Sequence, residues 1–406
     1  MKRIKIGFVG LGQRGKAMLD TFLAIDDVDV TSICDVYEDR VDDIEKLIKA
    51  KRNIEVKKYT DFDKMILDKN VDAIYIASSW EDHIKQSIKC MEAGIPVAME
   101  VGGAYKIKDC WDLVKTYEKT KTPIMMMENC CFDKFELLTT HLVRKGILGE
   151  IIHCHGAYSH DLRKEIIEGN INRHYRLRNY ISRNCENYPT HELGPIAKIL
   201  NINRGNKFLT ISSVASKSRG LHEYANKKDC KDKSLKNQEF KQGDIVSTNI
   251  VCENGETITM TLNTTLPGHY SREFNVKGTK GYADMDTYSI GIDGEIEEIY
   301  TPWDFNKKHI MDASRYDKYL PKCWKNITKK EIDLGHGGMD IILVRAFINC
   351  LKNNLPMPID VYDAASWYAI TPLSEMSIKH NGKPYKIPDF TKGKYKNRTE
   401  LDVIDF

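Results

Sequence analysis

Several classes of protein are excluded by what this chain of 406 residues lacks. It has no run of about 18 apolar residues, so we expect no segment that crosses a membrane. Its 61 basic and 58 acidic residues are spread along the chain, with a net charge of +3 and no basic cluster. We therefore expect no nucleic-acid partner. Internal repeats and low-complexity segments are also absent.

Disulfide bonds are not expected either, although the chain holds eleven cysteines. No Cys-x-x-Cys pair occurs, and the adjacent Cys130 and Cys131 have poor geometry for a bridge. A chain of this length needs no disulfide for stability, so we interpret all eleven as reduced thiols. The sequence opens directly into an apolar strand, without a signal segment. Both observations favour a cytoplasmic protein; a leader trimmed beforehand would leave the same start.

The length exceeds the usual size of a single core, which predicts two domains. In the first third of the chain, apolar strands alternate with helical patterns, as in a parallel sheet covered by helices on both faces. We assign residues 1–129 to this α/β domain. Its expected strands are Arg3–Val9, Val28–Cys34, Val71–Ala77, Ile95–Glu100 and Pro123–Glu128.

The pattern changes near residue 150. Two dipeptides, Asn254-Gly255 and Asp293-Gly294, are typical of the turn in a β-hairpin. Such hairpins predict a second domain, residues 130–406, of α+β type with an open, mostly antiparallel sheet. The paired strands would be Ile245–Cys252 with Thr257–Thr264, and Ser289–Ile292 with Glu295–Tyr300; further strands are expected at Glu150–Tyr158 and Thr210–Ala215.

A glycine-rich loop follows the first strand, with Gly10, Gly12 and Gly15 spaced as GxGxxG. The first glycine allows a tight turn, the second lets backbone approach a pyrophosphate, and the third permits close helix–strand packing. Asp35 ends the second strand, where a carboxylate accepts from a ribose 2′-hydroxyl and repels a 2′-phosphate. A plain glycine turn and an ordinary strand-end Asp are the alternatives. The order strand, loop, helix favours a Rossmann domain that binds NAD rather than NADP.

Residues suited to proton transfer occur in the second domain. Oxidising a carbinol removes a hydride from carbon and a proton from the hydroxyl, and His191 has a suitable pKa to accept that proton. Tyr158 could take a proton from carbon only if a neighbouring charge lowers its pKa, and Arg176 is a candidate. Tyr188 lies three residues before His191, where a loop ends and a helix begins. Taken singly, each residue also has a plain interpretation. His191 could be a polar residue at a helix start, Tyr158 an aromatic residue on a sheet face and Arg176 a surface charge.

A metal site was weighed at three histidines. His153 and His155 alternate on one strand and so share a face, and His160 follows. Cys154 points to the other face, and no carboxylate or thiolate with motif spacing completes the set. We therefore expect no metal.

The chain resembles the Gfo/Idh/MocA oxidoreductase superfamily and, within it, glycoside hydrolase family 109, the NAD-dependent α-N-acetylgalactosaminidases. The likeness covers almost the whole chain. The segments that carry it are Glu128-Asn129-Cys130-Cys131, Gly156-Ala157-Tyr158-Ser159-His160-Asp161-Leu162-Arg163, Tyr188-Pro189-Thr190-His191, Asn201-Ile202-Asn203-Arg204-Gly205-Asn206, Asn263-Thr264-Thr265-Leu266-Pro267, His336-Gly337-Gly338-Met339-Asp340 and Pro388-Asp389-Phe390-Thr391-Lys392-Gly393.

This resemblance implies hydrolysis of terminal N-acetylgalactosamine, α-linked, without net redox change. NAD oxidises the sugar at C3, a base removes the acidified C2 proton, and the C1 substituent is eliminated. Water then adds and the hydride returns to C3, a route unlike the usual two-carboxylate mechanism. A glycan or glycoside is the implied partner. A homo-oligomer, as superfamily members often form through their open sheets, is an analogy only.

The resemblance also implies the site residues. Tyr158 would be the C2 base, and His191 would handle the proton of the C3 hydroxyl. The family's sugar contacts fall on Tyr158, Arg176, His191 and Tyr270, while Tyr188 would touch both sugar and cofactor. Its cofactor contacts fall on Gln13, Arg14, Asp35, Trp80, His83, Glu100, Val101 and Asn129.

One departure from the wider superfamily favours the glycosidase. Sugar dehydrogenases usually carry Glu-Lys-Pro with an assisting lysine, where this chain reads Glu100-Val101-Gly102. Within the narrower family, Tyr175 replaces a common tryptophan and Glu192 replaces a common glycine. Two alternatives stay open. An NAD-dependent sugar dehydrogenase on the same scaffold would form NADH from free sugars, and a sensor would keep NAD without turnover.

Overall fold

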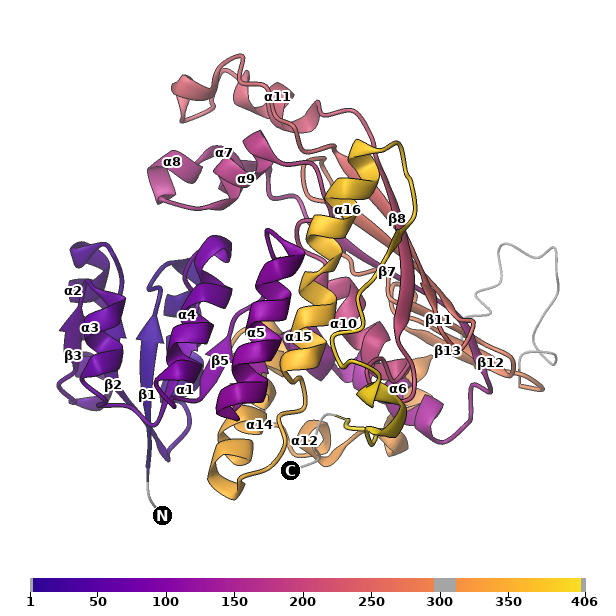
Figure 1. Cartoon of the computed structure of the whole chain (residues 1–406), viewed down its shortest axis with the longest axis horizontal. Helices are drawn as coiled ribbons and strands as arrows, with labels where there is room; N and C mark the ends of the chain where they lie inside the picture. The colour runs from indigo at the N-terminus through magenta and orange to yellow at the C-terminus, as the bar shows by residue number, and fades with distance from the viewer. Residues whose placement is uncertain (1–2, 296–311, 403–406) are drawn as a thin grey trace.

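The computed structural model describes residues 3–295 and 312–402, and it places two β-sheets side by side with helices between and around them (Figure 1). No helix in these two ranges combines the length and apolar character needed to cross a membrane. All eleven cysteines are free and buried, as expected from the sequence.

The N-terminal sheet is parallel and has six strands in the order β3-β2-β1-β4-β5-β6. The order reverses between β1 and β4, and ligands of such sheets bind beyond the carboxyl ends of the strands at this switch point. The strands are β1 Ile4–Val9, β2 Val28–Cys34, β3 Lys57–Tyr59, β4 Ala73–Ile76, β5 Val97–Met99 and β6 Ile124–Met126. Their helices are α1 Gln13–Leu23, α2 Glu38–Arg52, α3 Phe62–Leu67, α4 Trp80–Glu92 and α5 Ile107–Thr120.

This sheet confirms the predicted Rossmann architecture and adds one strand. β4 and β5 are buried along their whole length, which explains why they read as continuous apolar runs. β3 escaped prediction because its sequence, Lys57-Lys58-Tyr59, is polar and lies at the exposed edge of the sheet.

The second sheet has eight strands in the order β13-β12-β11-β7-β10-β9-β8-β14. Only the β7–β10 pair is parallel, so the prediction of an open, mostly antiparallel sheet is confirmed. The strands are β7 Ile151–Ser159, β8 Phe208–Ala215, β9 Ile245–Cys252, β10 Thr257–Asn263, β11 Asn275–Gly278, β12 Gly281–Asp284, β13 Ser289–Ile292 and β14 Tyr385–Lys386. Gly255 has φ +103° in the β9–β10 turn. The strand expected at Glu295–Tyr300 falls largely outside the described residues.

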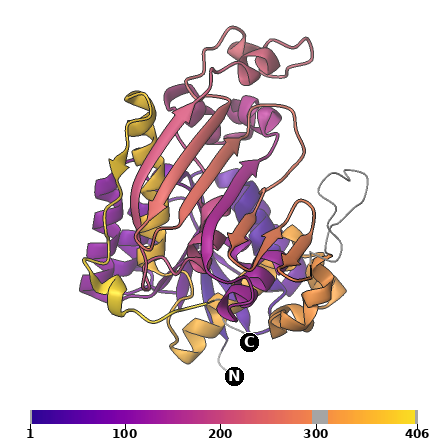
Figure 2. The ribbon, with the colours of Figure 1, turned by 90° about the vertical axis from the view of Figure 1, so that its right-hand side faces the viewer.

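Helices cover one face of this sheet, and Figure 2 shows its strands in front of them. α10 packs on β7 and α16 packs on β8. The helices of this half are α6 Lys134–Arg144, α7 Arg163–Ile167, α8 Gly169–Asn172, α9 Arg176–Ser182, α10 Thr190–Ile199, α11 Gly220–Ala225, α12 Lys322–Lys325, α13 Lys329–Ile332, α14 Met339–Asn353, α15 Val361–Tyr368 and α16 Ile370–Lys379. The 3₁₀ turns are η1 Asn129–Phe132, η2 Lys233–Leu235, η3 Ala313–Tyr319, η4 His336–Gly338 and η5 Lys394–Asn397.

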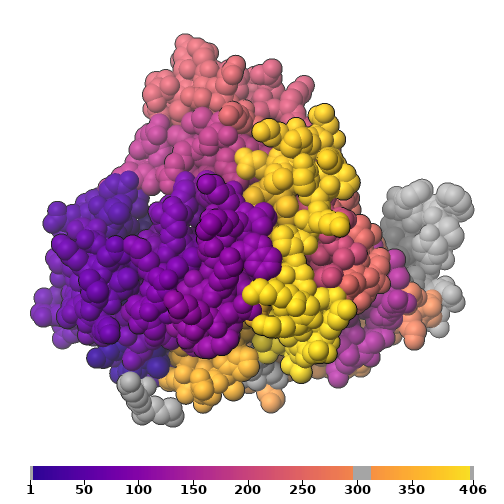
Figure 3. All heavy atoms as spheres, viewed as in Figure 1, coloured from indigo at the N-terminus to yellow at the C-terminus, as the bar shows by residue number. Residues whose placement is uncertain are grey.

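The C-terminal helices return to the first sheet and join the two halves. α14 contacts α1, α15 contacts α5 and β6, and the Met126 amide donates to the Ile359 carbonyl at 3.1 Å. Figure 3 shows the last part of the chain lying along the junction. Buried Arg204 fixes this return by pairing with Asp363 at 2.7 Å, so the motif around Asn201–Asn206 is structural.

Candidate active site

The glycine loop has the geometry that its spacing predicts. Gly10 has φ +86°, and a Cβ there would lie 2.4 Å from the Ala77 backbone. A Cβ on Gly15 would lie 1.9 Å from the Gly10 carbonyl oxygen, so this glycine permits the close packing of α1 on the loop. At Gly12 the nearest atom is 3.4 Å away, on the Arg40 guanidinium. The loop is therefore tight at its ends and open at Gly12, as approach by a pyrophosphate requires.

A cavity of about 310 Å³ opens at the carboxyl ends of β1, β2 and β4. Asp35 lies at its wall, where its carboxylate accepts from the Leu11 amide at 2.7 Å and the Tyr37 amide at 3.0 Å. These bonds hold the carboxylate beside the glycine loop, in the position that suits a ribose hydroxyl. Five of the predicted cofactor residues line the cavity: Gly10, Gly12, Gln13, Arg14 and Asp35.

Residues of the second predicted domain close one side of the same cavity, which the sequence did not predict. Residues 172–175 and Arg178 contribute to its lining. Arg173 forms two hydrogen bonds with Asp39, at 2.9 and 2.7 Å, and its guanidinium stacks on the Tyr37 ring at 4.2 Å. Residues of both predicted domains therefore line the cavity.

Arg14 and Asn129, both predicted cofactor contacts, are held by a carboxylate that sequence reasoning had not assigned. The Arg14 guanidinium bonds to Glu100 at 2.9 Å and to Asp340 at 2.9 Å. Asp340 also accepts from the Asn129 amide at 2.9 Å and is bonded to His336 at 2.8 Å. Burial raises the pKa of Asp340, but the interactions with Arg14 and His336 together outweigh burial and hold that pKa far below its usual range. Asp340 therefore stays ionised and orients both residues.

The remaining predicted cofactor residues do not line this cavity. Glu100 accepts from the Tyr75 hydroxyl at 2.8 Å and from the Val101 amide at 3.2 Å. His83 is buried, with one ring nitrogen 3.1 Å from the Ser78 carbonyl and Nδ1 unpaired. The Trp80 ring lies 4.9 Å from that of Tyr175, which lines the cavity, and 5.6 Å from that of Tyr188. Trp80 therefore lies between the cavity and the residues predicted to contact the sugar. Their contact with the cofactor stays a prediction.

Three of the rings that the sequence predicts to contact the sugar form one cluster. Tyr158 at the end of β7 lies 4.8 Å from Tyr188 and 5.3 Å from His191, measured between ring centroids, and Tyr188 lies 4.7 Å from His191. Both tyrosines are buried, and His191 is partly buried in the first turn of α10. Tyr158 is thus brought against two rings that follow it by 30 and 33 positions in the chain.

Arg176 lies over this cluster and is not the surface charge that the plain alternative described. Its guanidinium is 4.9 Å from the Trp80 ring and 4.8 Å from the Tyr188 ring, and only 7% of the residue is exposed. Glu165 pairs with its Nε at 2.9 Å. Its Nη1 is buried and has no hydrogen-bond partner among the residues that the structure describes. A buried donor of this kind suits a ligand oxygen.

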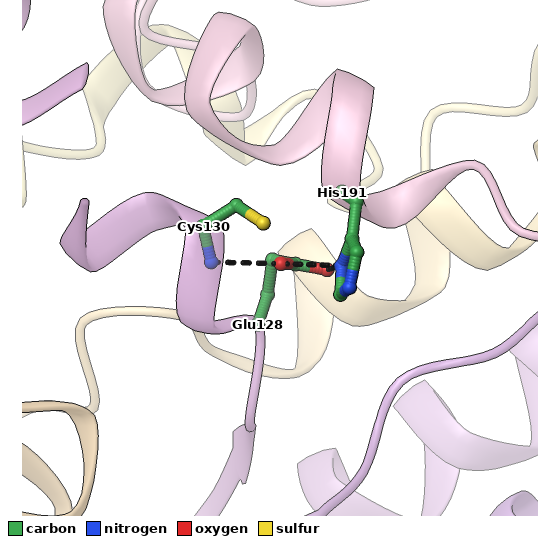
Figure 4. Close-up of side chains that lie close together, drawn as sticks. All are labelled: Glu128, Cys130 and His191. Atoms are coloured by element: carbon green, nitrogen blue, oxygen red, sulfur yellow. Dashed lines mark hydrogen bonds and ion pairs between the residues drawn. The ribbon is translucent and has the colours of Figure 1, made fainter. Parts of the chain in front are cut away.

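His191 is held by Glu128, which the sequence had marked only as a strand end (Figure 4). The Glu128 carboxylate lies 2.9 Å from His191 Nδ1 and also accepts from the Cys130 amide at 3.0 Å. Burial raises the pKa of Glu128, but His191, together with Thr190 and the Cys130 amide, lowers it further than burial raises it. An ionised Glu128 places the ring proton on Nδ1 and leaves Nε2 as the basic nitrogen.

Two family models match the chain in succession. Residues 4–128 match the oxidoreductase family with an NAD-binding Rossmann fold, and residues 132–397 match the glycosyl hydrolase 109 C-terminal domain. An α-N-acetylgalactosaminidase of Tannerella forsythia is 36% identical over 97% of this chain and 88% of its own length. A glycosyl hydrolase family 109 protein of Stenotrophomonas maltophilia is 35% identical over 100% of this chain and 92% of its own length.

The chain belongs to glycosyl hydrolase family 109. It is a glycosidase-family enzyme with an NAD-binding Rossmann domain.

Solved structures share the fold of this family 109 chain at low sequence identity. An Agrobacterium radiobacter oxidoreductase in complex with NAD⁺, L-tartaric acid and magnesium has a TM-score of 0.68 and 15% identity, covering 95% of this chain and 99% of that one. A Lactobacillus casei scyllo-inositol dehydrogenase with bound NAD(H) and scyllo-inositol has a TM-score of 0.65 and 15% identity, covering 95% and 99%. At this identity the likeness concerns the fold alone.

The condition that a neighbouring charge lowers the pKa of Tyr158 is not met, although Arg176 is the charge that the sequence named as a candidate. Arg176 does act in that direction, but burial raises the pKa of the phenol by more, so that it lies far above its usual value. The Tyr158 hydroxyl lies 3.1 Å from His160 Nδ1. The sequence could not weigh these effects because burial depends on the packing of several segments.

Tyr270, the last predicted sugar contact, lies at the edge of the cluster. Its ring centroid is 5.2 Å from His160 and 6.4 Å from Tyr158, and the residue is 47% exposed. Arg272 donates to its hydroxyl at 3.2 Å. A half-exposed ring beside a buried cluster is well placed to meet a sugar that enters from solvent.

Among the described residues, one group has the spacing of metal ligands, and it is not the histidine set that was weighed and rejected from the sequence. Ligand atoms of Glu128, Cys130 and His191 lie within 4.8 Å of one another, and the Glu128–His191 hydrogen bond occupies two of them. His153 and His155 instead bond through Nδ1 to the hydroxyls of Thr257 and Thr259, both at 2.8 Å. The two histidines of β7 therefore bond to the neighbouring strand β10.

Proposed function

We propose that this enzyme removes terminal α-linked N-acetylgalactosamine by oxidation at C3, elimination across C1–C2, addition of water and re-reduction. One observation carries the proposal: two separate proton acceptors, Tyr158 and His191, lie 5.3 Å apart between ring centroids. A simple alcohol dehydrogenation needs one base. A route that removes a proton first from the C3 hydroxyl and then from the adjacent C2 carbon needs two, side by side.

The cofactor residues fit NAD. The loop is open only at Gly12, Asp35 suits a ribose hydroxyl, and Gln13 and Arg14 line the same cavity. NAD supplies a hydride acceptor at the start of each cycle and a hydride donor at its end. Because Asp35 is held rigidly by two backbone amides, a 2′-phosphate would meet a fixed negative charge, which favours NAD over NADP.

His191 takes the proton of the C3 hydroxyl in this proposal. Glu128 accepts the Nδ1 proton, so Nε2 carries the lone pair that receives the proton. The carboxylate also stabilises the imidazolium that forms. When the C3 ketone is reduced again, the same proton returns to the C3 oxygen.

Tyr158 acts at C2. Once C3 is a ketone, the C2 hydrogen is acidic. Its proton passes to the Tyr158 oxygen in its phenolate form, the C2–H electron pair forms the C1–C2 double bond, and the C1–O bond pair leaves with the aglycone oxygen. When water adds, its hydroxide bonds to C1, its proton goes to the aglycone oxygen, and C2 regains a proton from Tyr158. Arg176 and Tyr270 orient the sugar, with the unpaired Arg176 Nη1 as a donor to a sugar oxygen.

The test compares aryl α- and β-N-acetylgalactosaminides with protein stripped of NAD and then reloaded. We expect aglycone release from the α anomer, restored by catalytic NAD, with no accumulation of NADH. Accumulation of NADH on free sugars without aglycone release would instead identify a sugar dehydrogenase. Absence of both would refute turnover of these sugars.

A further inference from the structure

The hydroxyl of Tyr158 has one hydrogen-bond partner among the described side chains, and that partner is a second histidine. Tyr158 Oη lies 3.1 Å from His160 Nδ1, and the two rings are nearly perpendicular at 88°. Both residues come from the end of β7 and the turn after it. The pair is therefore built into one short stretch of backbone.

A buried phenol is a poor proton acceptor as long as it keeps its own proton. Tyr158 is 5% exposed, and burial raises the pKa of its hydroxyl against the opposing charge of Arg176. Arg176 cannot accept this proton, because arginine only donates. His191 is bonded through Nδ1 to the Glu128 carboxylate, and its Nε2 serves the C3 hydroxyl in the proposed function. His160 is the neighbour whose ring nitrogen lies within hydrogen-bond distance of the Tyr158 hydroxyl.

His160 stays neutral in the resting site. Burial, followed by the charge of Arg176, lowers the pKa of His160. The groups that face it come from several elements: Arg176 from α9, Glu165 from α7, His191 from α10, Asp161 from its own turn and the half-exposed ring of Tyr270. The two carboxylates act in the opposite direction and would stabilise an imidazolium once it forms.

We propose that His160 is a positioning residue that receives the phenolic proton of Tyr158 and so makes its oxygen competent to take the C2 proton. The inference rests on the proposed function. In the step, the Tyr158 O–H bond breaks and the proton passes to His160 Nδ1. The phenolate oxygen then bonds to the C2 proton while the C2–H electron pair forms the C1–C2 double bond and the C1 substituent leaves. On addition of water, C2 regains a proton from Tyr158 and His160 returns its proton to the phenol.

The test separates C2 chemistry from C3 chemistry. His160→Gln keeps a polar side chain but cannot accept and hold a proton at neutral pH. Its matched control is His153→Gln, a histidine of β7 that bonds to Thr257. For each variant, one measures NAD binding, transient formation of reduced nicotinamide with substrate, and elimination from a 3-keto glycoside, which bypasses the C3 oxidation.

We expect elimination by His160→Gln to fall by about 10²-fold, the usual size of a general-base contribution. NAD binding and transient reduction should stay near wild type, and His153→Gln should be unaffected throughout. Elimination by His160→Gln should also rise steadily toward high pH, where the phenol ionises without help. That rise is a signature that a purely structural role would not produce.

Unchanged elimination in His160→Gln, or an equal loss of elimination and transient reduction, would overturn the inference. Should the variant fail to fold, the wild type gives an independent answer. Its elimination from the 3-keto glycoside should fall in acid as His160 becomes protonated, and a flat profile would overturn the inference. A wild type that neither reduces NAD nor eliminates would instead mean that the proposed function has failed.

Discussion

The two sides of the active site are built in different ways. The cofactor side rests on backbone geometry: a glycine loop, two amides that hold Asp35, and the switch point of a parallel sheet. The sugar side rests on the surroundings of ionisable side chains gathered from β7, α9 and α10. Spacing alone encodes the first kind of site, whereas the second exists only after the chain has packed.

The largest effect is expected from the sugar side. Tyr158→Phe keeps the ring that contacts Tyr188 and His191 but removes the oxygen that the proposed C2 step requires. Deuterium exchange at C2 should fall by about 10²–10⁴-fold while NAD binding is spared. Exchange followed by NMR, with NAD affinity as the control, decides the matter. Unchanged exchange would remove Tyr158 from the role of base.

A smaller effect is expected when one methyl group is added to the glycine loop on the cofactor side. Gly15→Ala places a Cβ 1.9 Å from the Gly10 carbonyl oxygen, so the loop must shift. Such overpacking costs about 1–3 kcal/mol, which corresponds to roughly 5–150-fold in NAD affinity if the shift is borne by the loop. Titration with NAD measures it. Gly268→Ala, with no atom within 4 Å of its new Cβ, should bind NAD like the wild type.

The smallest effect concerns two carboxyl groups beneath the sugar cluster. Glu186 and Glu192 are both buried; burial raises the pKa of Glu186 to about 8, and burial with the Glu186 charge raises the pKa of Glu192. A raised folded-state pKa gives stability that is fully present below the unfolded value, about 4.3, and lost as pH rises through the folded value. The protein should therefore lose stability between about pH 4.3 and about pH 8.

Glu192→Gln removes the second charge and can donate to Glu186. We expect the loss of stability between about pH 5 and about pH 9 to shrink by roughly 1–3 kcal/mol in this variant. Chemical denaturation at the two pH values measures the difference, and exposed Glu92→Gln serves as the control. An equal loss in wild type and Glu192→Gln would show that the pair does not share a proton.

Sequence reasoning reached the cofactor side because each of its parts has a local signal. Gly10, Gly12 and Gly15 lie in one loop after one strand, and the strands buried on both faces read as apolar runs. The same reasoning named Tyr158, Arg176 and His191 from their chemistry and assigned their roles by resemblance. It named Arg176 as a candidate to lower the Tyr158 pKa but could not weigh burial, which outweighs the charge of Arg176 in the folded protein.

Other features had no local signal. Asp39 and Arg173 are 134 residues apart, and Arg14 and Asp340 are 326 residues apart, so their ion pairs appear only in the folded chain. The hydrogen bond between Glu128 and His191 likewise joins the residues after β6 to α10. Polar residues that pair across such separations look, in the sequence, like any other surface charge. A single sequence therefore does not predict which charged residues orient the side chains of a site.

The most direct test of the account is the position of deuterium in sugar released from an aryl α-N-acetylgalactosaminide in D₂O. Oxidation and elimination predict that the released sugar carries deuterium at C2, because the proton taken by Tyr158 exchanges before water adds. Direct displacement at C1 would leave the original hydrogen at C2. Release with protium retained at C2 would contradict the central claim.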